Sequence, residues 1–291
     1  MNSVLAIARK IAEDRLAMCG LVIVLGLVFV AIFAPYLATH PNDVWNIHPA
    51  KRLQPPSLLN LLGTDRLGAD IYSRLLFGAR ITILIAVIAA IASLAIGVPI
   101  GLIAGYYHTW FTDILMRVAD VFLAIPQVVL AIAIAQTLGP NIQNVIIALS
   151  VTFWPWFARL TYAETRRLKN ETFIEAMLAL GASPLRIIGL HILPNIASAI
   201  IVRTSITMGF AILTAATLGF LGLGAQPPTP EWGRMIAESR EFLPNAWWYA
   251  AAPGIAIFAV VMGFNLLGDG LRDVLDPRLR RTGRGRAPQG S

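Results

Sequence analysis

Six apolar segments constrain the fold of this 291-residue chain more than any other feature. A helix rises about 1.5 Å per residue, so about 20 apolar residues are needed to cross about 30 Å of hydrocarbon. The composition agrees, because 57% of the residues are hydrophobic and only 13% are charged, against about 45–50% and about 25% in soluble domains. The sequence predicts an all-α integral membrane protein. The expected transmembrane helices are 16–38, 81–105, 114–137, 142–160, 196–224 and 247–271.

The distribution of Lys and Arg predicts the orientation of the chain. The formal net charge is +7, but no soluble basic module interleaved with aromatic residues indicates nucleic-acid binding. Positive charge gathers at the N-terminus, in the 159–195 loop and in the Arg-rich tail 276–291. Because Lys and Arg are enriched in cytoplasmic loops, we expect both ends in the cytoplasm. The exception is the stretch after the first span, where Lys51, Arg52, Arg66, Arg74 and Arg80 would lie outside.

Two features near the second span predict local structure. Ile71, Arg74, Leu75 and Gly78 recur at helical spacing and favour a short amphipathic helix along the membrane interface; the alternative is a solvated linker. Within the span, a small residue recurs every four positions, which favours close packing against another helix. A role for this stripe in a conducting path is the alternative. The stripe is Gly97, Gly101 and Gly105.

A few polar residues lie within the expected spans, where ionisable groups are costly. Arg117 and Asp120 are three residues apart, so they share a helix face and are predicted to form a structural ion pair. A proton relay is the alternative, but it needs further acids or histidines deep in other spans.

Prolines are expected to interrupt two spans, at Pro126 and Pro155. A broken helix exposes backbone groups that can line a cavity. The possible translocation-path residues are polar side chains that could equally form hydrogen bonds between helices: Gln127, Gln136 and Asn265.

The loop at 161–195 is predicted to form two short helices joined by a tight turn. Thr172 and Glu175 have the spacing of a capping box, and Gly181 is expected to stop the first helix. Ser183 then serves as N-cap and Pro184 as the first residue of a second helix that ends at Pro194. Exposed Leu, Ile and Ala on such a hairpin imply a docking partner, unless the hairpin packs against the ends of its own spans.

This loop resembles the "EAA" loop of ABC importer permease subunits of the dipeptide/oligopeptide/nickel type. The match is carried by Glu175-Ala176-Met177, Gly181 and His191-Ile192-Leu193-Pro194, with departures at Met177 and His191. The resemblance to the C-type subunit extends along nearly the whole chain. Its other parts are Leu62 to Asp65, Ser73 to Leu75, Gly78 to Arg80, Arg117 to Pro126, Phe220 to Gly224, Asn265 to Asp269, Leu271 to Asp273 and Asp276-Pro277.

The resemblance implies a type I ABC importer transmembrane domain in the bacterial inner membrane, with the loop as a coupling helix on a separate ATPase. It divides the chain into an N-terminal tail, first span and extracytoplasmic segment (1–80), a permease core (81–275, with the coupling loop at 161–195) and a cytoplasmic tail (276–291). The coupling residues that it implies are Glu175, Ala176, Gly181, Ser183, Leu185, Ile188, Leu193 and Pro194.

The resemblance also implies partners. These are a homologous second permease in a heterodimer, one or two P-loop ATPase subunits, an extracytoplasmic solute-binding protein and membrane lipid. The chain has no G-x-x-x-x-G-K-[ST] motif, so no catalytic residue, metal or cofactor is expected in it, and ATP and Mg²⁺ belong to the partners. The transported solute is left open between a dipeptide, a longer peptide, glutathione, nickel or another compound.

Two other classes of function are alternatives. A secondary transporter or channel would show inverted repeats, discontinuous helices in matching positions and acids at the midplane. A membrane-bound enzyme would show His, Asp and Glu clustered at ligand or triad spacing. The sequence shows neither the deep acids nor such a cluster.

Overall fold

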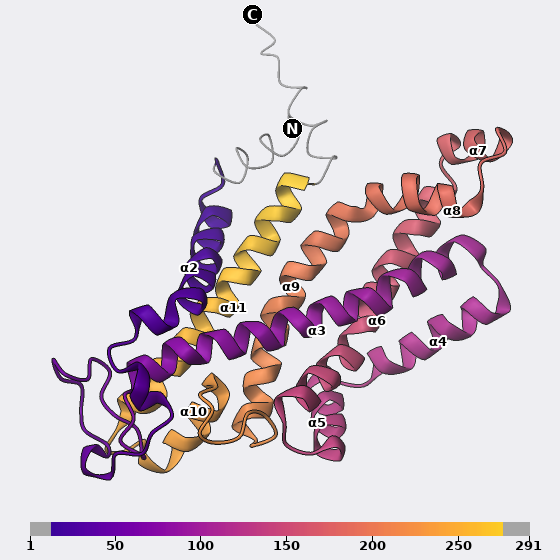
Figure 1. Ribbon diagram of the computed structural model, residues 1–291. Helices are drawn as coiled ribbons and strands as arrows, with labels where there is room; N and C mark the ends of the chain where they lie inside the picture. Colours follow the sequence, from indigo (N-terminus) through magenta and orange to yellow (C-terminus); the bar gives the residue numbers. More distant parts are fainter. Residues whose placement is uncertain (1–12, 276–291) are drawn as a thin grey trace, which may run out of the picture.

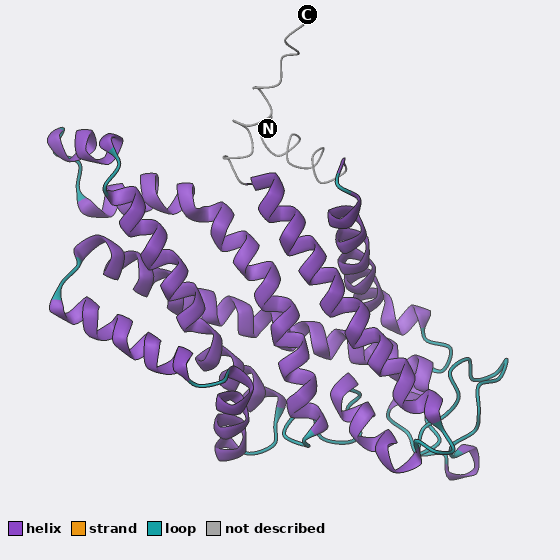
Figure 2. Cartoon of the chain, turned by 180° about the vertical axis from the view of Figure 1, so that it is seen from behind, coloured by secondary structure: helices purple, strands orange, loops and turns teal. Residues whose placement is uncertain are grey.

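A computed structural model describes residues 13–275 and is built from helices (Figures 1 and 2). In the described residues the only β-type pairing is an isolated bridge between Thr64 and Asp70. The expected all-α fold is therefore confirmed. The elements are α2 (Arg15–Leu37), η1 (Pro41–Val44), η2 (Pro49–Lys51), α3 (Ile71–Tyr107), α4 (Trp110–Ala124), α5 (Gln127–Leu138), α6 (Ile142–Lys169), α7 (Thr172–Ala179), α8 (Pro184–Arg186), the π-helix η3 (Ile187–Ile192), α9 (Leu193–Phe220), α10 (Trp232–Ser239), η4 (Arg240–Phe242) and α11 (Trp247–Leu275).

Helices long and apolar enough to cross a membrane correspond to the expected spans. Five of them pass by themselves: α2, α3, α6, α9 as part of Pro184–Phe220, and α11. The bent pair α4 and α5 makes a sixth if the two count as one span. The expected tail at 276–291 and the first twelve residues of the expected N-terminal tail lie outside the described residues.

Helix α3 is longer than expected, because it begins at Ile71 and not near residue 81. The predicted amphipathic interfacial helix is therefore wrong, and its residues form the first turns of α3. Asp70 fixes this start, since its carboxylate accepts a hydrogen bond of 2.9 Å from the amide of Ser73. At about 1.5 Å per residue, the 37 residues of α3 exceed the hydrocarbon thickness. Figure 1 shows α3 running obliquely in front of α9 and α11, from the end of the bundle near α10 towards the end near the hairpin.

The third expected span is interrupted at Pro126, as the proline predicts. Helices α4 and α5 meet at an angle of 95°. Ile125 is extended, with φ −89° and ψ 132°, because a residue before proline avoids the helical region. The break expected in the fourth span at Pro155 does not occur, and α6 runs continuously through that proline.

The glycine stripe of α3 packs against α6, as the packing interpretation predicts. A Cβ atom on Gly105 would lie 2.8 Å from Cβ of Thr165 on α6. A Cβ atom on Gly101 would overlap Oγ1 of Thr161 and the carbonyl oxygen of Ala158. The two helix backbones are therefore in close approach, which small residues permit. The seam leaves no room for a path between α3 and α6.

Candidate functional site

The hairpin formed by α7 and α8 lies at one end of the helix bundle, beyond the ends of the spans (Figure 1). The start of α2 and the end of α11 lie at this same end, and α10 lies at the opposite end. Ile174 and Ile187 are fully buried and join a cluster with Leu168 of α6 and with Val98 and Leu102 of α3. One face of the hairpin is thus anchored to the chain's own spans.

The turn between α7 and α8 is fixed by Gly181, which has φ +78°. Its amide donates a hydrogen bond of 3.0 Å to the carbonyl oxygen of Leu178, and the amide of Ala182 donates one of 3.0 Å to that of Met177. This pair of bonds is the Schellman motif, which ends a helix at a residue in the left-handed region. The helix stop expected at Gly181 is present.

The helix starts of the hairpin differ from the predicted capping. Thr172 is the first helical residue and Glu171 occupies the N-cap position, with no side-chain capping bond. The predicted capping box of Thr172 and Glu175 is therefore wrong. It requires Thr172 at the N-cap position, but the helix begins one residue earlier and Thr172 is already its first helical residue. Ser183 is the N-cap residue before Pro184, as expected, but its side chain makes no capping hydrogen bond.

Pro194 does not end the second helix, contrary to expectation. The helical path runs from Pro184 through the π-helix into α9, which continues to Phe220. The amide of Leu193 donates to the carbonyl oxygen of Ile188, five residues back. Pro194 has no amide hydrogen, so the wider π turn accommodates it within a continuous helix.

The hairpin exposes the face that does not pack on the spans. Leu185 is 78% exposed, and Leu180, which the sequence reasoning did not single out, is 82% exposed. Both leucines flank the turn at Gly181, and the only sequence signal for Leu180 is its place next to that glycine. Of the predicted coupling residues, Ile188 is half-buried, and the others are exposed: Glu175, Ala176, Gly181, Ser183, Leu185, Leu193 and Pro194.

The three polar residues proposed for a translocation path lie on two different elements. Gln127 is the first residue of α5, and Gln136 is exposed near the end of that helix, about 13 Å further along at 1.5 Å per residue. Asn265 is exposed on α11 and faces α9. Its Oδ1 lies 3.7 Å from where a Cβ atom added to Gly209 of α9 would be. None of the three lines the cavity between α6, α9 and α11 that is described below.

The predicted ion pair between Arg117 and Asp120 is wrong. Asp120 accepts a hydrogen bond of 2.6 Å from Nε of Arg159 on α6, and a second contact joins Nη2 of Arg159 to Oδ2. The ion pair of Asp120 and Arg159 therefore connects α4 to α6. Asp120 pairs with an arginine on another helix instead of with Arg117 on its own helix.

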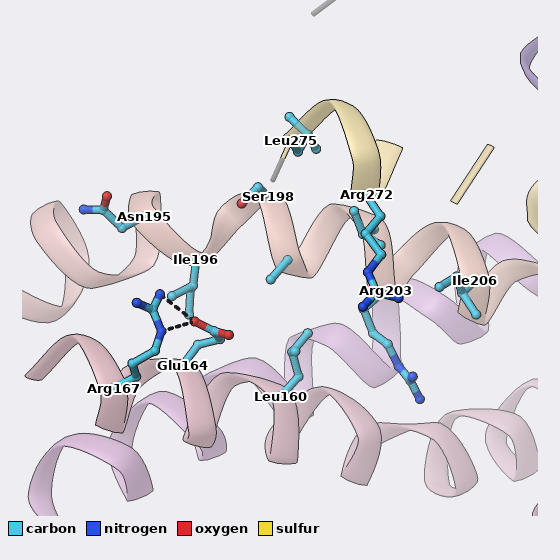
Figure 3. A pocket seen from close by; sticks show the side chains of 12 residues that line it. Leu160, Glu164, Arg167, Asn195, Ile196, Ser198, Arg203, Ile206, Arg272 and Leu275 are labelled. Atoms are coloured by element: carbon cyan, nitrogen blue, oxygen red, sulfur yellow. Dashed lines mark hydrogen bonds and ion pairs between the residues drawn. The ribbon is translucent and has the colours of Figure 1, made fainter. Parts of the chain in front are cut away.

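A cavity of about 570 Å³ lies between α6, α9 and α11, at the hairpin end of the bundle (Figure 3). Three arginines line it. Arg167 donates two hydrogen bonds, of 3.0 and 2.9 Å, to Oε2 of Glu164. Arg203 reaches towards α6, where its guanidinium lies 4.2 Å from the ring centroid of Trp156. Arg272 enters from the last turn of α11.

A buried ion network lies at the opposite end and joins the segment after α2 to three helices. Arg74 of α3 pairs with Asp65, and its Nη2 lies 3.8 Å from Oε2 of Glu238 on α10. Glu238 also contacts Arg66 at 3.2 Å and accepts a hydrogen bond of 3.1 Å from the hydroxyl of Tyr249 on α11. Three of the five cations that opposed the predicted orientation are therefore paired with carboxylates: Arg66 and Arg74 in this network, and Lys51, whose Nζ lies 3.8 Å from Oδ2 of Asp43.

Two carboxylates at this end have opposite pKa changes. Burial raises the pKa of Glu238, but the charges of Arg74 and Arg66, helped by hydrogen bonds, outweigh it and hold that pKa below its ordinary value. Glu231 caps α10 by accepting 2.8 Å hydrogen bonds from the amides of Gly233 and Arg234. Burial raises the pKa of Glu231 to about 7 despite these bonds.

Comparisons with known proteins match nearly the whole chain. The family of binding-protein-dependent transport system inner membrane components matches residues 97–281, and the N-terminal transmembrane domain of oligopeptide transport permease C matches residues 5–56. The dipeptide transport system permease protein DppC of Alkalihalophilus pseudofirmus is 44% identical over 272 residues, which are 94% of this chain and 89% of that protein. The glutathione transport system permease protein GsiD of Escherichia coli is 46% identical over 273 residues, with the same two shares.

The fold also matches a solved structure. A chain of the MetNI methionine ABC transporter in an inward facing conformation aligns with a TM-score of 0.58 at 20% identity, over 71% of this chain and 98% of that one. At this identity the likeness establishes the fold alone.

Proposed function

The chain belongs to the family of binding-protein-dependent transport system inner membrane components and is a permease subunit of an ABC importer, and we propose that it imports peptides. Relatives named for dipeptide, di/tripeptide and glutathione transport match it over at least 94% of its length. Glutathione is itself a small peptide, so these names agree on one chemical class. They support a short peptide as the solute.

The observation that carries the coupling role is the exposed hairpin. Leu180 and Leu185 expose most of their apolar surface on either side of a turn that Gly181 fixes. A patch of this kind on an element that the spans hold firmly is suited to a protein partner. The proposed partner is a P-loop ATPase, which binds ATP and Mg²⁺ and whose movement reaches the spans through Ile174 and Ile187.

The proposed orientation places the hairpin, the start of α2 and the end of α11 in the cytoplasm. Lys and Arg support this, since Arg166, Arg167, Lys169 and Arg186 all lie at the hairpin end. The opposite end, with residues 38–70 and α10, then faces outwards and receives a solute-binding protein. A homologous second permease completes the path in a heterodimer.

Ion-coupled secondary transport has one observation in its favour, the break between α4 and α5. That class uses broken helices in corresponding positions of two repeats. The residues from 13 to 275 contain one bent pair that passes as a span, so the matching partner is absent from that part of the chain. The permease assignment accounts for the hairpin as well, and the secondary transporter does not.

Replacing Leu185 by Glu tests the coupling role. Leu185 is 78% exposed, so the new charge leaves the fold intact but disrupts an apolar contact with a partner. We expect the ATPase subunits to stop co-purifying with the permease, and peptide-stimulated ATP hydrolysis in proteoliposomes to fall to background. Leu58→Glu is the matched control, because Leu58 is 99% exposed at the other end. Retained ATPase binding in Leu185→Glu would contradict the proposal.

Gly181→Pro provides a second test through the backbone. Proline cannot adopt φ +78°, and it removes the amide that donates to Leu178. Gly139→Pro is its control, because Gly139 also has positive φ and an amide bonded to a preceding helix, α5. Loss of ATPase association is expected only for Gly181→Pro, with membrane insertion unchanged in both.

A further inference from the structure

The cavity between α6, α9 and α11 holds two arginines without a carboxylate partner. Glu164 is engaged by Arg167. No carboxylate among residues 13–275 lies within ion-pair distance of Arg203 or Arg272, and Nε of Arg203 is buried without a hydrogen-bond partner. Within the described part of the chain, the cavity therefore carries positive charge that no carboxylate pairs with.

Both arginines lie in the half of their helix that is nearer to the hairpin end of the bundle. The ends of α9 and α11 that lie opposite the hairpin are Phe220 and Trp247. At about 1.5 Å per residue, Arg203 lies about 25 Å from Phe220 and Arg272 lies about 37 Å from Trp247. For a hydrocarbon layer about 30 Å thick, Arg272 then lies beyond the layer on the hairpin side, and the backbone of Arg203 lies within its last few ångströms.

The walls of the cavity are apolar next to these charges. Leu160 of α6 and Ile206 of α9 point into the cavity on the side of Arg203, and Ile196 lies beside Glu164 (Figure 3). Cationic groups beside an apolar wall, at the boundary between headgroups and hydrocarbon, match the two parts of a phospholipid. Basic pockets between membrane helices are recognised binding sites for anionic headgroups.

We propose that this cavity binds an anionic phospholipid, with Arg203 and Arg272 on its phosphate and Leu160 and Ile206 against the first part of an acyl chain. Arginine suits this role, because its planar guanidinium donates paired hydrogen bonds to phosphate oxygens. The contact of Arg203 with Trp156 holds that side chain across the cavity. The proposal does not depend on the transported solute.

Lipid retention by the full-length chain tests the proposal. The protein is purified in complex with its partner permease, exchanged into nanodiscs or mild detergent with phosphatidylglycerol or phosphatidylcholine, and analysed by native mass spectrometry. We expect preferential retention of phosphatidylglycerol. Arg203→Gln and Arg272→Gln should each weaken it by about fivefold, and the double substitution by about 25-fold.

Arg166→Gln is the matched control. Arg166 lies one residue before Arg167 on the same helix, is exposed, bonds to the hydroxyl of Tyr162 at 3.0 Å and does not line the cavity. It should retain phosphatidylglycerol as the unmodified protein does. An equal loss in Arg166→Gln would show general surface attraction and overturn the site.

Three further outcomes decide the source of the phosphate and the accessibility of the cavity. Displacement of the lipid by millimolar inorganic phosphate would assign the site to a free anion and overturn the lipid proposal. Retention by the isolated chain but not by the permease complex would show that the second permease covers the cavity, and would also overturn it. Resistance to phosphate with retention in the complex supports it.

Discussion

Arg159 on α6 donates a hydrogen bond of 2.6 Å from Nε to Oδ1 of Asp120 on α4, and this ion pair holds α4 against the bundle just before the bend into α5. Both side chains are partly exposed, at 36% and 49%, so solvent and lipid headgroups screen the pair. A double-mutant cycle of Asp120→Asn and Arg159→Gln should give a coupling energy of about 0.5–1 kcal/mol. Thermal unfolding in detergent measures it.

The control cycle pairs Asp120→Asn with Arg117→Gln, which should give no coupling within error. Coupling of Asp120 to Arg117 rather than to Arg159 would contradict the observed pairing.

Asp65→Asn should strongly destabilise the end of the bundle opposite the hairpin. The substitution keeps the oxygen that accepts from the amides of Leu67 and Ala69, but removes the charge facing Arg74, which is 2% exposed. A buried charge that loses its partner costs about 3–5 kcal/mol. The midpoint of thermal unfolding in detergent should therefore fall clearly.

Asp43→Asn is the control, because Asp43 contacts the half-exposed Lys51 at 3.8 Å, and it should cost at most about 1 kcal/mol. Equal losses in the two variants would show that burial of the network does not matter.

Glu231 should make the stability of the protein fall as pH rises. Its pKa is about 7 in the folded chain, against an ordinary value of 4.5. Between these values the folded form keeps a proton that the unfolded form has lost, so raising the pH favours unfolding. The contribution is full below pH 4.5, declines across the window and is lost above about pH 7.

Unfolding midpoints between pH 4.5 and 8 should show this decline, and Glu231→Gln should flatten it. Asp113→Asn is a control at an exposed site. An unchanged slope in Glu231→Gln would assign the pH dependence to another group.

Gly101→Ala should separate α3 from α6. The added methyl group overlaps Oγ1 of Thr161 and the carbonyl oxygen of Ala158, and overpacking of this kind costs about 1–3 kcal/mol. Gly26→Ala on α2 meets nothing within 4 Å, so it should be neutral or stabilising, since alanine favours helix. Comparing the two unfolding midpoints in one detergent checks this, and equal midpoints would contradict close packing at the seam.

The spans and the glycine seam were predictable because hydropathy and four-residue spacing are local properties of the sequence. Pro126 and Pro155 show that the sequence alone does not determine whether a proline breaks a span, since only Pro126 does so. Around Pro155, Phe153 and Phe157 are buried in the core, so packing holds the helix together across the missing hydrogen bond. Around Pro126, Ile125 and Ala124 are exposed, and no comparable packing opposes the break.

The partners of the charged residues were not predictable for a related reason. Asp120 has a neighbour at helical spacing, Arg117, yet the fold brings Arg159 from the facing helix. Arg74 is sandwiched between Asp65 and Glu238, and nothing local to α3 indicates Glu238. In the hairpin, the glycine stop was predictable from one residue. The position of Pro194 was not, because the π turn that tolerates it depends on a hydrogen bond from Leu193 to the carbonyl oxygen of Ile188, one residue further back than in an α-helix.

Helix α3 runs without interruption from the buried ion network to the base of the hairpin. Its first turn is clamped in the ion network by Arg74, and its last turn holds the base of the hairpin, where Nζ of Lys169 donates a hydrogen bond of 2.6 Å to the carbonyl oxygen of Tyr106. A rod about 55 Å long, at 1.5 Å per residue, acts as a lever, and a rocking of about 5° shifts one tip by about 5 Å relative to the other. A pull at the hairpin would therefore reach the opposite end of the bundle as a displacement comparable to one helical turn.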